Sequence, residues 1–233
     1  MVSEVYKKEN YVEVAIENFH DYINNLTFSL QKYVDMFYNT LPELYEETRS
    51  EGHKHMKCQE MSSFLYAESE SLISMKCKHF VYQSISVIQN KFDKLSTDIT
   101  EDDEVRTFRF SEEGYFYFLH ELDRIDWNSL TDRRYHDKKH SVNEACQFEE
   151  YKTKKLDILK MNKFTDDKIT YNNNQLIVPL QTAYTKVIDT LHKMRSIIDA
   201  SNNLYDIVMI TREVIDILLL TYIAISYVEI IED

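Results

Sequence analysis

Basic residues and histidines crowd together between Arg133 and His140, in the segment RRYHDKKH. Histidine can accept or donate a proton near neutral pH, and an arginine guanidinium can hold a phosphate group through two parallel hydrogen bonds. Side chains of these types on one helix indicate a site for a phosphate-containing ligand. The candidate catalytic residues are Arg133, Arg134 and His140, and the candidate substrate-binding residues are His136, Lys138 and Lys139.

The spacing leaves open which arginine works with His140. On a regular helix Arg133 and His140 lie within about 20° of each other in projection, two turns apart along the axis. Arg134 and His140 are about 120° apart by the same geometry. Arg134 therefore reaches His140 only on an irregular helix, or if a second protomer supplies one of the two residues.

The basic charge of this acidic chain is concentrated around the same segment. The formal net charge is −13, but residues 133–163 contain nine lysines and arginines against five acidic residues, which leaves −17 for the rest. Repulsion by the acidic surface opposes general binding to nucleic acid or anionic membrane, so we expect any polyanion to bind locally. The alternative is that the charged run is only a solvated helix face.

The arginines and His140 also satisfy a known pattern, R-x4-6-H, once from Arg133 and once from Arg134. In this the chain resembles the HEPN superfamily of all-helical nucleotide-binding and RNA-binding domains, which are common in bacterial defence and toxin systems. In that family a polar residue, often asparagine, usually follows the arginine. Here Arg134 follows Arg133 and Tyr135 follows Arg134, so the pattern does not choose between the two arginines.

The resemblance implies an RNA-binding domain or a metal-independent endoribonuclease, without a cofactor. His140 would act as general acid or base, and Arg133 or Arg134 would neutralise charge on the phosphate, with His136 and Lys139 assisting. The 2′-hydroxyl of the substrate would be the nucleophile, so RNA rather than DNA would be cut.

The composition favours helices as the elements that position this cluster. Two glycines and two prolines in 233 residues are too few for the turns of a sheet-rich fold. Apolar residues recur at steps of three and four along most of the chain. We expect one all-α domain over residues 1–233, a helical bundle of about six to seven helices with one small β-hairpin at about 168–178. Its N-terminal helices span 10–49 and its core bundle spans 57–233.

Several helix boundaries can be predicted from capping residues and prolines. Residues 40–43, TLPE, indicate a new helix or a kink, and Ser111 can cap a short helix. The cluster is assigned to a central helix over about 128–163. Pro179 is expected to begin the next helix, and the last apolar helix is expected over 204–231.

The last helix is apolar on every side, but it is too short to span a membrane. Only twelve uncharged residues separate Asp216 from Glu229, well short of the roughly 20 that a bilayer needs. We expect it to be buried within the bundle or in a homodimer. Three widely spaced cysteines and the acidic N-terminal segment favour a cytoplasmic protein.

No metal site is expected. His53, His55 and Cys58 lie close together, but no second pair of ligands of the kind found in zinc sites is visible. The alternative functional class is a non-catalytic interaction or adaptor protein. Its acidic surface would bind a basic protein partner, and the arginine and histidine cluster would then be only a salt-bridged helix face.

Overall fold

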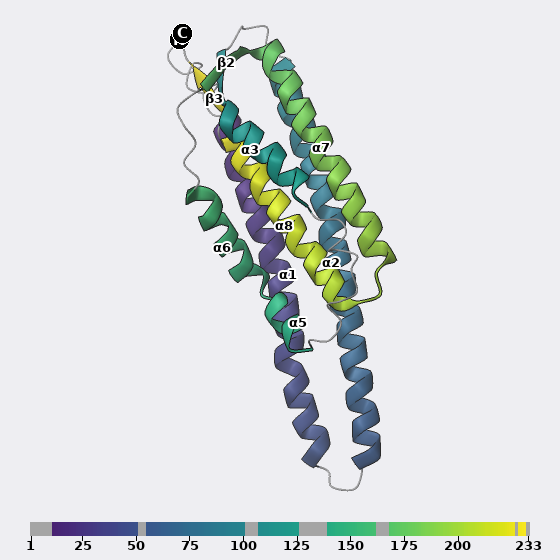
Figure 1. Cartoon of the computed structure of the whole chain (residues 1–233). Coiled ribbons are helices and arrows are strands. Elements are labelled where there is room, and N and C mark those ends of the chain that lie inside the picture. The colour runs from purple at the N-terminus through teal and green to yellow at the C-terminus, as the bar shows by residue number, and fades with distance from the viewer. Residues whose placement is uncertain are drawn as a thin grey trace.

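The computed structural model describes residues 11–50, 55–100, 107–125, 139–161, 168–226 and 228–231, and the side chains of most of them. Its elements are α1 (Tyr11–Ser50), α2 (His55–Thr100), β1 (Thr107–Ser111), α3 (Glu112–Asp123), α5 (Lys139–Ala145), α6 (Phe148–Met161), β2 (Lys168–Asn172), α7 (Asn173–Ala200), α8 (Leu204–Ser226) and β3 (Val228–Ile231). The described residues thus contain seven helices, arranged as an elongated bundle (Figure 1). The predicted all-α bundle is confirmed.

Helix α8 is the centre of the bundle. It packs against α1, α2, α3, α5, α6 and α7, and it lies among the other helices (Figure 1). Val208, Val214 and Leu218 on it are almost inaccessible to solvent. Its buried threonines return their hydroxyl hydrogen bonds to their own helix, Thr211 to Ile207 O at 2.8 Å and Thr221 to Ile217 O at 2.7 Å. Because these hydroxyls bond within the helix, the two threonines can be buried among its apolar residues.

The central position of α8 bears on the expected homodimer. The reason for expecting a dimer was that a helix apolar on all sides needs neighbours on all sides. One chain already supplies these neighbours, from six helices. The homodimer stays a prediction, and a dimer would have to use another surface.

The expected β-hairpin at 168–178 is wrong. Lys168–Asn172 does form a strand, but residues 175–178 belong to the first turns of α7. The strand order is β2-β1-β3, all antiparallel, with Phe108 opposite Tyr171 on one side and Ile230 on the other. The partner of β2 is β1, which is distant in the sequence, and a local turn signal could not reveal it.

Other boundaries also differ from the predictions. Helix α1 continues through residues 40–43 to Ser50. Helix α7 begins six residues before Pro179, which lies inside it. An interior proline removes one backbone hydrogen bond at a cost of about 3 kcal/mol, which the surrounding packing must offset. Helix α8 ends at Ser226 and does not continue to Ile231, because residues 228–231 pair with β1 as a strand.

The short helix expected after Ser111 is confirmed. Ser111 Oγ accepts a hydrogen bond from Gly114 N at 3.2 Å and caps α3. Phe118 and Leu122 are buried against the core, as the spacing predicted. The cap and the apolar spacing that predict this helix both lie within its own segment, so the sequence was sufficient to predict it.

Candidate functional site

The structure describes only the end of the arginine and histidine cluster. Arg133, Arg134, His136 and Lys138 lie outside the described residues. Lys139 and His140 are the first two residues of α5, although their side chains are also outside the description. Helix α5 packs against α8. His140 is therefore carried by a short helix that is attached to the centre of the bundle.

The single central helix expected over 128–163 is wrong in its described part. Helix α5 ends at Ala145, and α6 begins at Phe148. Cys146 lies between them in a turn and is buried, as are Ala145 and Phe148. Helical spacing over this segment predicts an apolar stripe of Leu130, Ala145, Phe148, Leu156 and Leu159. Ala145, Phe148 and Leu159 are buried and Leu156 is partly buried against the core, whereas Leu130 lies outside the described residues.

A glutamine from α1 explains why α6 can start where it does. The side-chain oxygen of Gln31 accepts hydrogen bonds from the backbone N–H groups of Phe148, at 2.5 Å, and Glu149, at 3.2 Å. The first N–H groups of a helix have no partner within it, and this acceptor supplies one. Gln31 is itself held by a bond from its amide nitrogen to Asp35, at 2.6 Å.

Charged side chains join α6 to α8 in what we call the α6–α8 ion cluster. Its members are Glu149, Tyr151, Lys152, Lys155, Arg212, Glu213 and Asp216. At its centre is Asp216 Oδ2, which accepts bonds from the Tyr151 hydroxyl and from Lys155 Nζ, both at 2.9 Å. The Arg212 guanidinium lies over the Tyr151 ring, 4.1 Å from its centroid. Such a charge and ring contact is favourable when water is excluded.

Lys152 shows how far the ion cluster is withdrawn from water. Its side chain is 9% exposed, and its ammonium bonds to Glu149 Oε2 at 2.5 Å. Lysine is almost never so buried unless it is paired. Within the described part of the chain, Glu149 Oε1, Arg212 Nε and Asp216 Oδ1 are buried and have no hydrogen-bond partner.

Burial also changes the protonation equilibria of the ion cluster. Desolvation raises the pKa of Asp216, although Lys155 and Tyr151 act in the opposite direction. Burial and the nearby Asp216 raise the pKa of Glu213. Burial is also the largest cause of the raised pKa of Tyr151. The two carboxyls therefore hold their protons more tightly than free carboxyls do.

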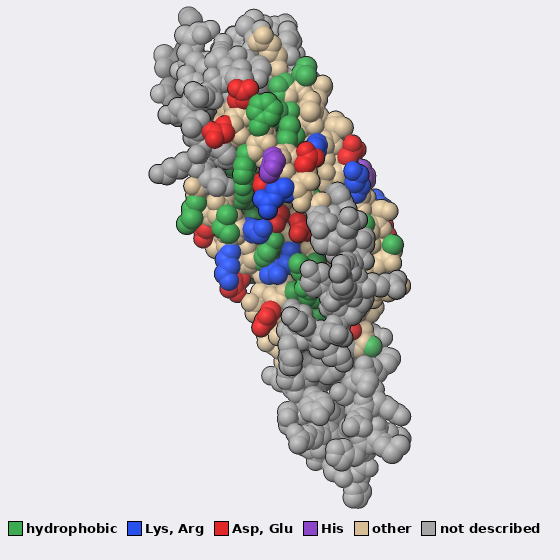
Figure 2. Space-filling model, in the orientation of Figure 1, with side chains coloured by type: hydrophobic (Ala, Val, Ile, Leu, Met, Phe, Trp, Pro, Cys, Tyr) green, Lys and Arg blue, Asp and Glu red, His purple; other side chains and the backbone are tan. Residues whose placement is uncertain are grey.

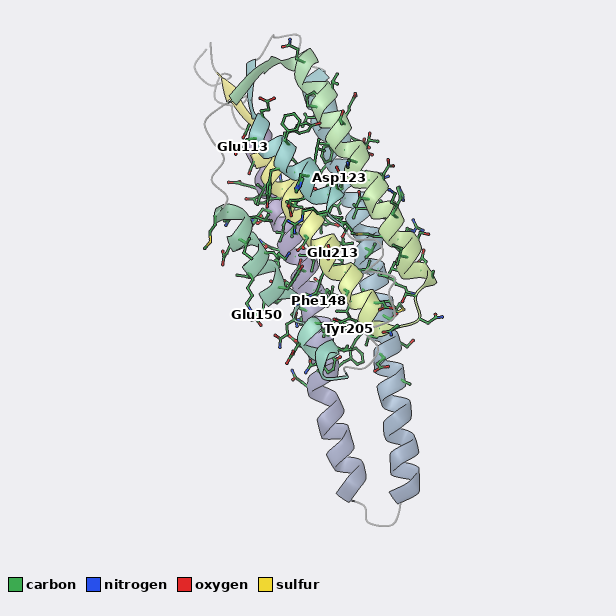
Figure 3. All side chains as sticks on the ribbon, in the orientation of Figure 1. Glu113, Asp123, Phe148, Glu150, Tyr205 and Glu213 are labelled. Atoms are coloured by element: carbon green, nitrogen blue, oxygen red, sulfur yellow. The ribbon has the colours of Figure 1, made fainter. Side chains whose placement is uncertain are left out.

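Lysine and arginine side chains gather on the middle of the face where α6 and α8 lie, with acidic side chains among them (Figure 2). Phe148, Glu150 and Glu213 lie in the same central region, where the start of α6 approaches α8 (Figure 3). The basic charge predicted for this part of the sequence is thus present, but much of it is paired. Lys152 pairs with Glu149, Lys154 with Glu150, and Lys155 with Asp216.

The ion cluster fixes α6 on α8. Only Cys146 and Gln147 separate α6 from α5. By holding α6 in place, the ion cluster therefore also restricts the position of α5 and of His140 on it. Sequence reasoning missed the cluster because α8 was treated as apolar throughout. The available signal was the segment TREVID at residues 211–216, whose charges interrupt an otherwise apolar run. Charged residues in a central helix need partners, and α6 supplies them.

Comparison with known proteins gave no relative. No protein-family model, curated protein or solved structure matches the chain. The resemblance to HEPN proteins consequently depends on the arginine and histidine pattern in a helical chain. Among the described residues, no group of three or more histidines, cysteines or carboxylates is arranged to hold a metal ion. No helix in the same residues is long and apolar enough to cross a membrane.

Proposed function

We propose that the chain is an HEPN-like RNA-binding protein with metal-independent endoribonuclease activity, acting in the cytoplasm as part of a defence or toxin system. His140 is the general acid or base, and Arg133 or Arg134 holds the scissile phosphate. His136, Lys138 and Lys139 contribute to binding the strand. The two described cysteines, Cys77 and Cys146, are free thiols, in keeping with a reducing compartment.

The observation that carries the proposal is that the helix bearing His140 is held firmly in the bundle. The residue stands at the start of α5, and the other end of α5 is anchored by buried Ala145 and Cys146. Helix α6 follows at once and is held by Gln31 and by the ion cluster. Catalytic side chains need rigid elements, because small displacements cost much of the rate. A histidine on this support meets that requirement.

If Arg134 is the working arginine, a homodimer becomes part of the proposal. Arg134 and His140 point about 120° apart on a regular helix. A two-fold axis near α5 would let the arginine of one protomer meet the histidine of its partner. Light scattering at micromolar concentration should then give the dimer mass. A monomer mass in a sample that cleaves RNA would contradict the shared site.

The direct test is cleavage of single-stranded RNA in EDTA. His140→Ala should slow cleavage by about a hundredfold or more, as the loss of a general acid or base does. Alanine at the working arginine should do the same, and lysine there should restore little, since a point charge cannot form the two-pronged contact. His192→Ala is the matched control, because His192 is exposed on α7. Undiminished cleavage by the His140 variant, or a requirement for divalent metal, would refute the mechanism.

The paired lysines of α6 favour a second candidate, a non-catalytic interaction protein. Lys152, Lys154 and Lys155 each have an acidic partner, which leaves less positive charge for RNA. With −17 outside residues 133–163, the remaining surface suits a basic protein partner. Calorimetric titration with a lysine-rich peptide tests this candidate. Salt-sensitive binding of the peptide, without RNA cleavage, would favour it over the nuclease.

A further inference from the structure

Two hollows lie side by side on the surface between α1 and α2. One has a volume of about 500 Å³ and the other about 450 Å³, and Tyr22, His79 and Gln83 line both. They therefore form one continuous depression, which we call the α1–α2 groove. Hollows of this size are typical of sites that hold a ligand.

The groove is electrostatically unlike the rest of the chain. The protein has 40 aspartates and glutamates, yet none of the described residues that line the groove is acidic. Lys76, His79 and Lys91 line it instead, and the amides of Gln83 and Asn90 lie between them. In a protein of net charge −13, a stretch without carboxylates is where an anion meets the least repulsion.

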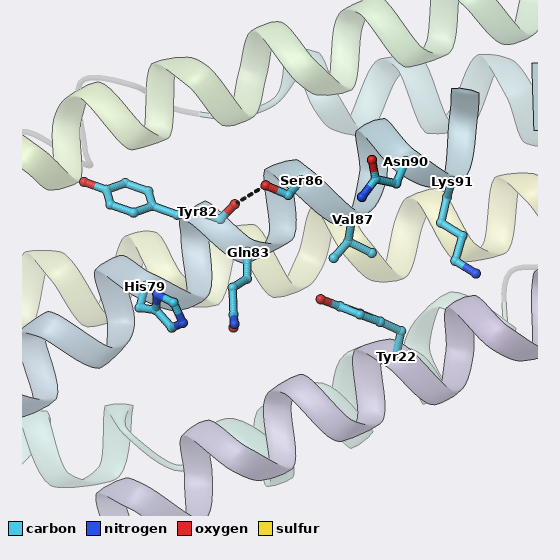
Figure 4. Close-up of a pocket in the computed structure, with 8 residues that line it drawn as sticks. All are labelled: Tyr22, His79, Tyr82, Gln83, Ser86, Val87, Asn90 and Lys91. Carbon is cyan, nitrogen blue, oxygen red and sulfur yellow. Dashed lines mark hydrogen bonds between the residues drawn. The ribbon is translucent and has the colours of Figure 1, made fainter. Parts of the chain in front are cut away.

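Tyr22 gives the groove an aromatic surface. Tyr22 is 36% exposed, and it reaches from α1 across the space toward α2 (Figure 4). Tyr33 lies further along α1, and its ring is already in contact with the Lys76 ammonium, 4.8 Å from the centroid, and with the Phe37 ring, 4.7 Å between centroids. Tyr82 also lines the groove, but its side chain points toward α7 and its hydroxyl donates to Asp199 (Figure 4).

The basic residues extend along the groove. Lys76 and Lys91 are on one helix, and fifteen residues of helix correspond to about 22 Å. Stacked nucleotides advance by about 3.4 Å each, so this length accepts several of them. Amides and imidazoles between the two lysines can bond to base edges or to ribose.

We infer that the α1–α2 groove binds single-stranded RNA, with a base stacked on Tyr22 and phosphates held by Lys76, His79 and Lys91. Aromatic surfaces beside cations are how proteins hold single strands without reading their sequence. The choice of RNA as the strand rests on the proposed function. The groove itself is distinct from the arginine and histidine cluster, and it would hold the strand rather than cut it.

Fluorescence anisotropy of a labelled 2′-O-methyl oligouridine 12-mer measures binding to the full chain, because this strand has no free 2′-hydroxyl to attack its own phosphate. Tyr22→Ala should weaken binding about tenfold, and Tyr22→Phe, which keeps the ring, should stay within about twofold. Lys76→Gln should reduce the slope of log K against log salt by about 0.7. Lys193→Gln is the matched control, since Lys193 is exposed on α7 and does not line the groove.

Wild-type binding by both Tyr22→Ala and Lys76→Gln would overturn the inference. So would competition by adenosine monophosphate at the same concentration as the 12-mer, which would indicate a site for a single nucleotide. Cleavage of unmodified RNA, measured in parallel, separates the two proposals. Binding that depends on the groove, without cleavage by the wild type, would support the groove and contradict the nuclease. Cleavage that depends on His140 but not on Tyr22 or Lys76 would support the nuclease and contradict RNA binding in the groove.

Discussion

Two carboxyls of the α6–α8 ion cluster should make stability depend on pH. The raised pKa values of Glu213 and Asp216 mean that the folded protein binds these protons more tightly than the unfolded chain. Their contribution to stability is therefore fully present below the ordinary carboxyl pKa and is lost as the pH rises through the raised values. Lys155 lies near both carboxyls and lowers the pKa of each, so it reduces the amount of stability that is lost as the pH rises.

We expect Glu213→Gln to raise the free energy of unfolding at pH 7.5 relative to wild type, and to have less effect at pH 4. The amide is neutral at both values, so it avoids burying a charge. Urea denaturation at a series of pH values measures this, with Glu144→Gln, at an exposed position of α5, as control. An equal effect of the Glu213 substitution at pH 4 and pH 7.5 would contradict the raised pKa.

The described cysteines should resist modification while the protein is folded. Burial raises the pKa of Cys77 and of Cys146 to about 12. Since the thiolate is the reactive form, neither thiol should react quickly at pH 8. Titration with a disulfide reagent should show both thiols reacting only after urea is added, with Cys77→Ala and Cys146→Ala variants assigning the signals. Rapid reaction of either one in buffer would contradict its burial.

At the scale of elements, the Gln31 contact should determine where α6 begins. Gln31→Ala removes the side-chain acceptor from Glu149 N and leaves Phe148 N with its bond to Cys146 O, and we expect a loss of about 1 kcal/mol in the free energy of unfolding, as for other N-cap deletions. Ser29→Ala is the control, because Ser29 is exposed and bonds only to Asn25 O of its own helix. Urea denaturation measures the free energy of unfolding of both variants. Equal stability of the two variants would show that the cap contributes nothing.

The same contact shows what the sequence could and could not predict. Helix α3 was predicted with its cap and its buried face because Ser111 and the apolar spacing are local. The break before α6 was missed because its cap comes from Gln31, on a different helix. The strand β2 was found, but its partner β1 was not, for the same reason. Periodicity identifies buried faces, whereas contacts between distant segments decide where elements stop.

The residues of the candidate site also differ in how far the sequence could reveal them. Arg133, Arg134 and His140 became candidates because spacing along one segment is visible in a sequence, and as site residues they stay a prediction. The ion cluster needs Asp216 on α8 to meet Tyr151 and Lys155 on α6, and the α1–α2 groove needs two helices side by side. Neither arrangement has a local signature.

At the scale of the whole molecule, the stability of the bundle should depend on α8. Leu218 is 1% exposed, whereas Met161 on α6 is 77% exposed. Leu218→Ala should therefore reduce the free energy of unfolding by about 2 to 5 kcal/mol, through lost burial and the cavity left behind. Met161→Ala should change it by less than about 0.5 kcal/mol. Denaturation of both variants checks this, and similar losses would contradict the central position of α8.

The measurement that tests the proposed chemistry most directly compares an RNA strand with the same strand carrying one 2′-deoxynucleotide at the cleaved position, both in EDTA. If the 2′-hydroxyl is the nucleophile and His140 moves its proton, the RNA is cut and the substituted strand stays intact at that position. Cleavage of the substituted strand at the same bond would mean that another nucleophile attacks the phosphate, and it would contradict the account.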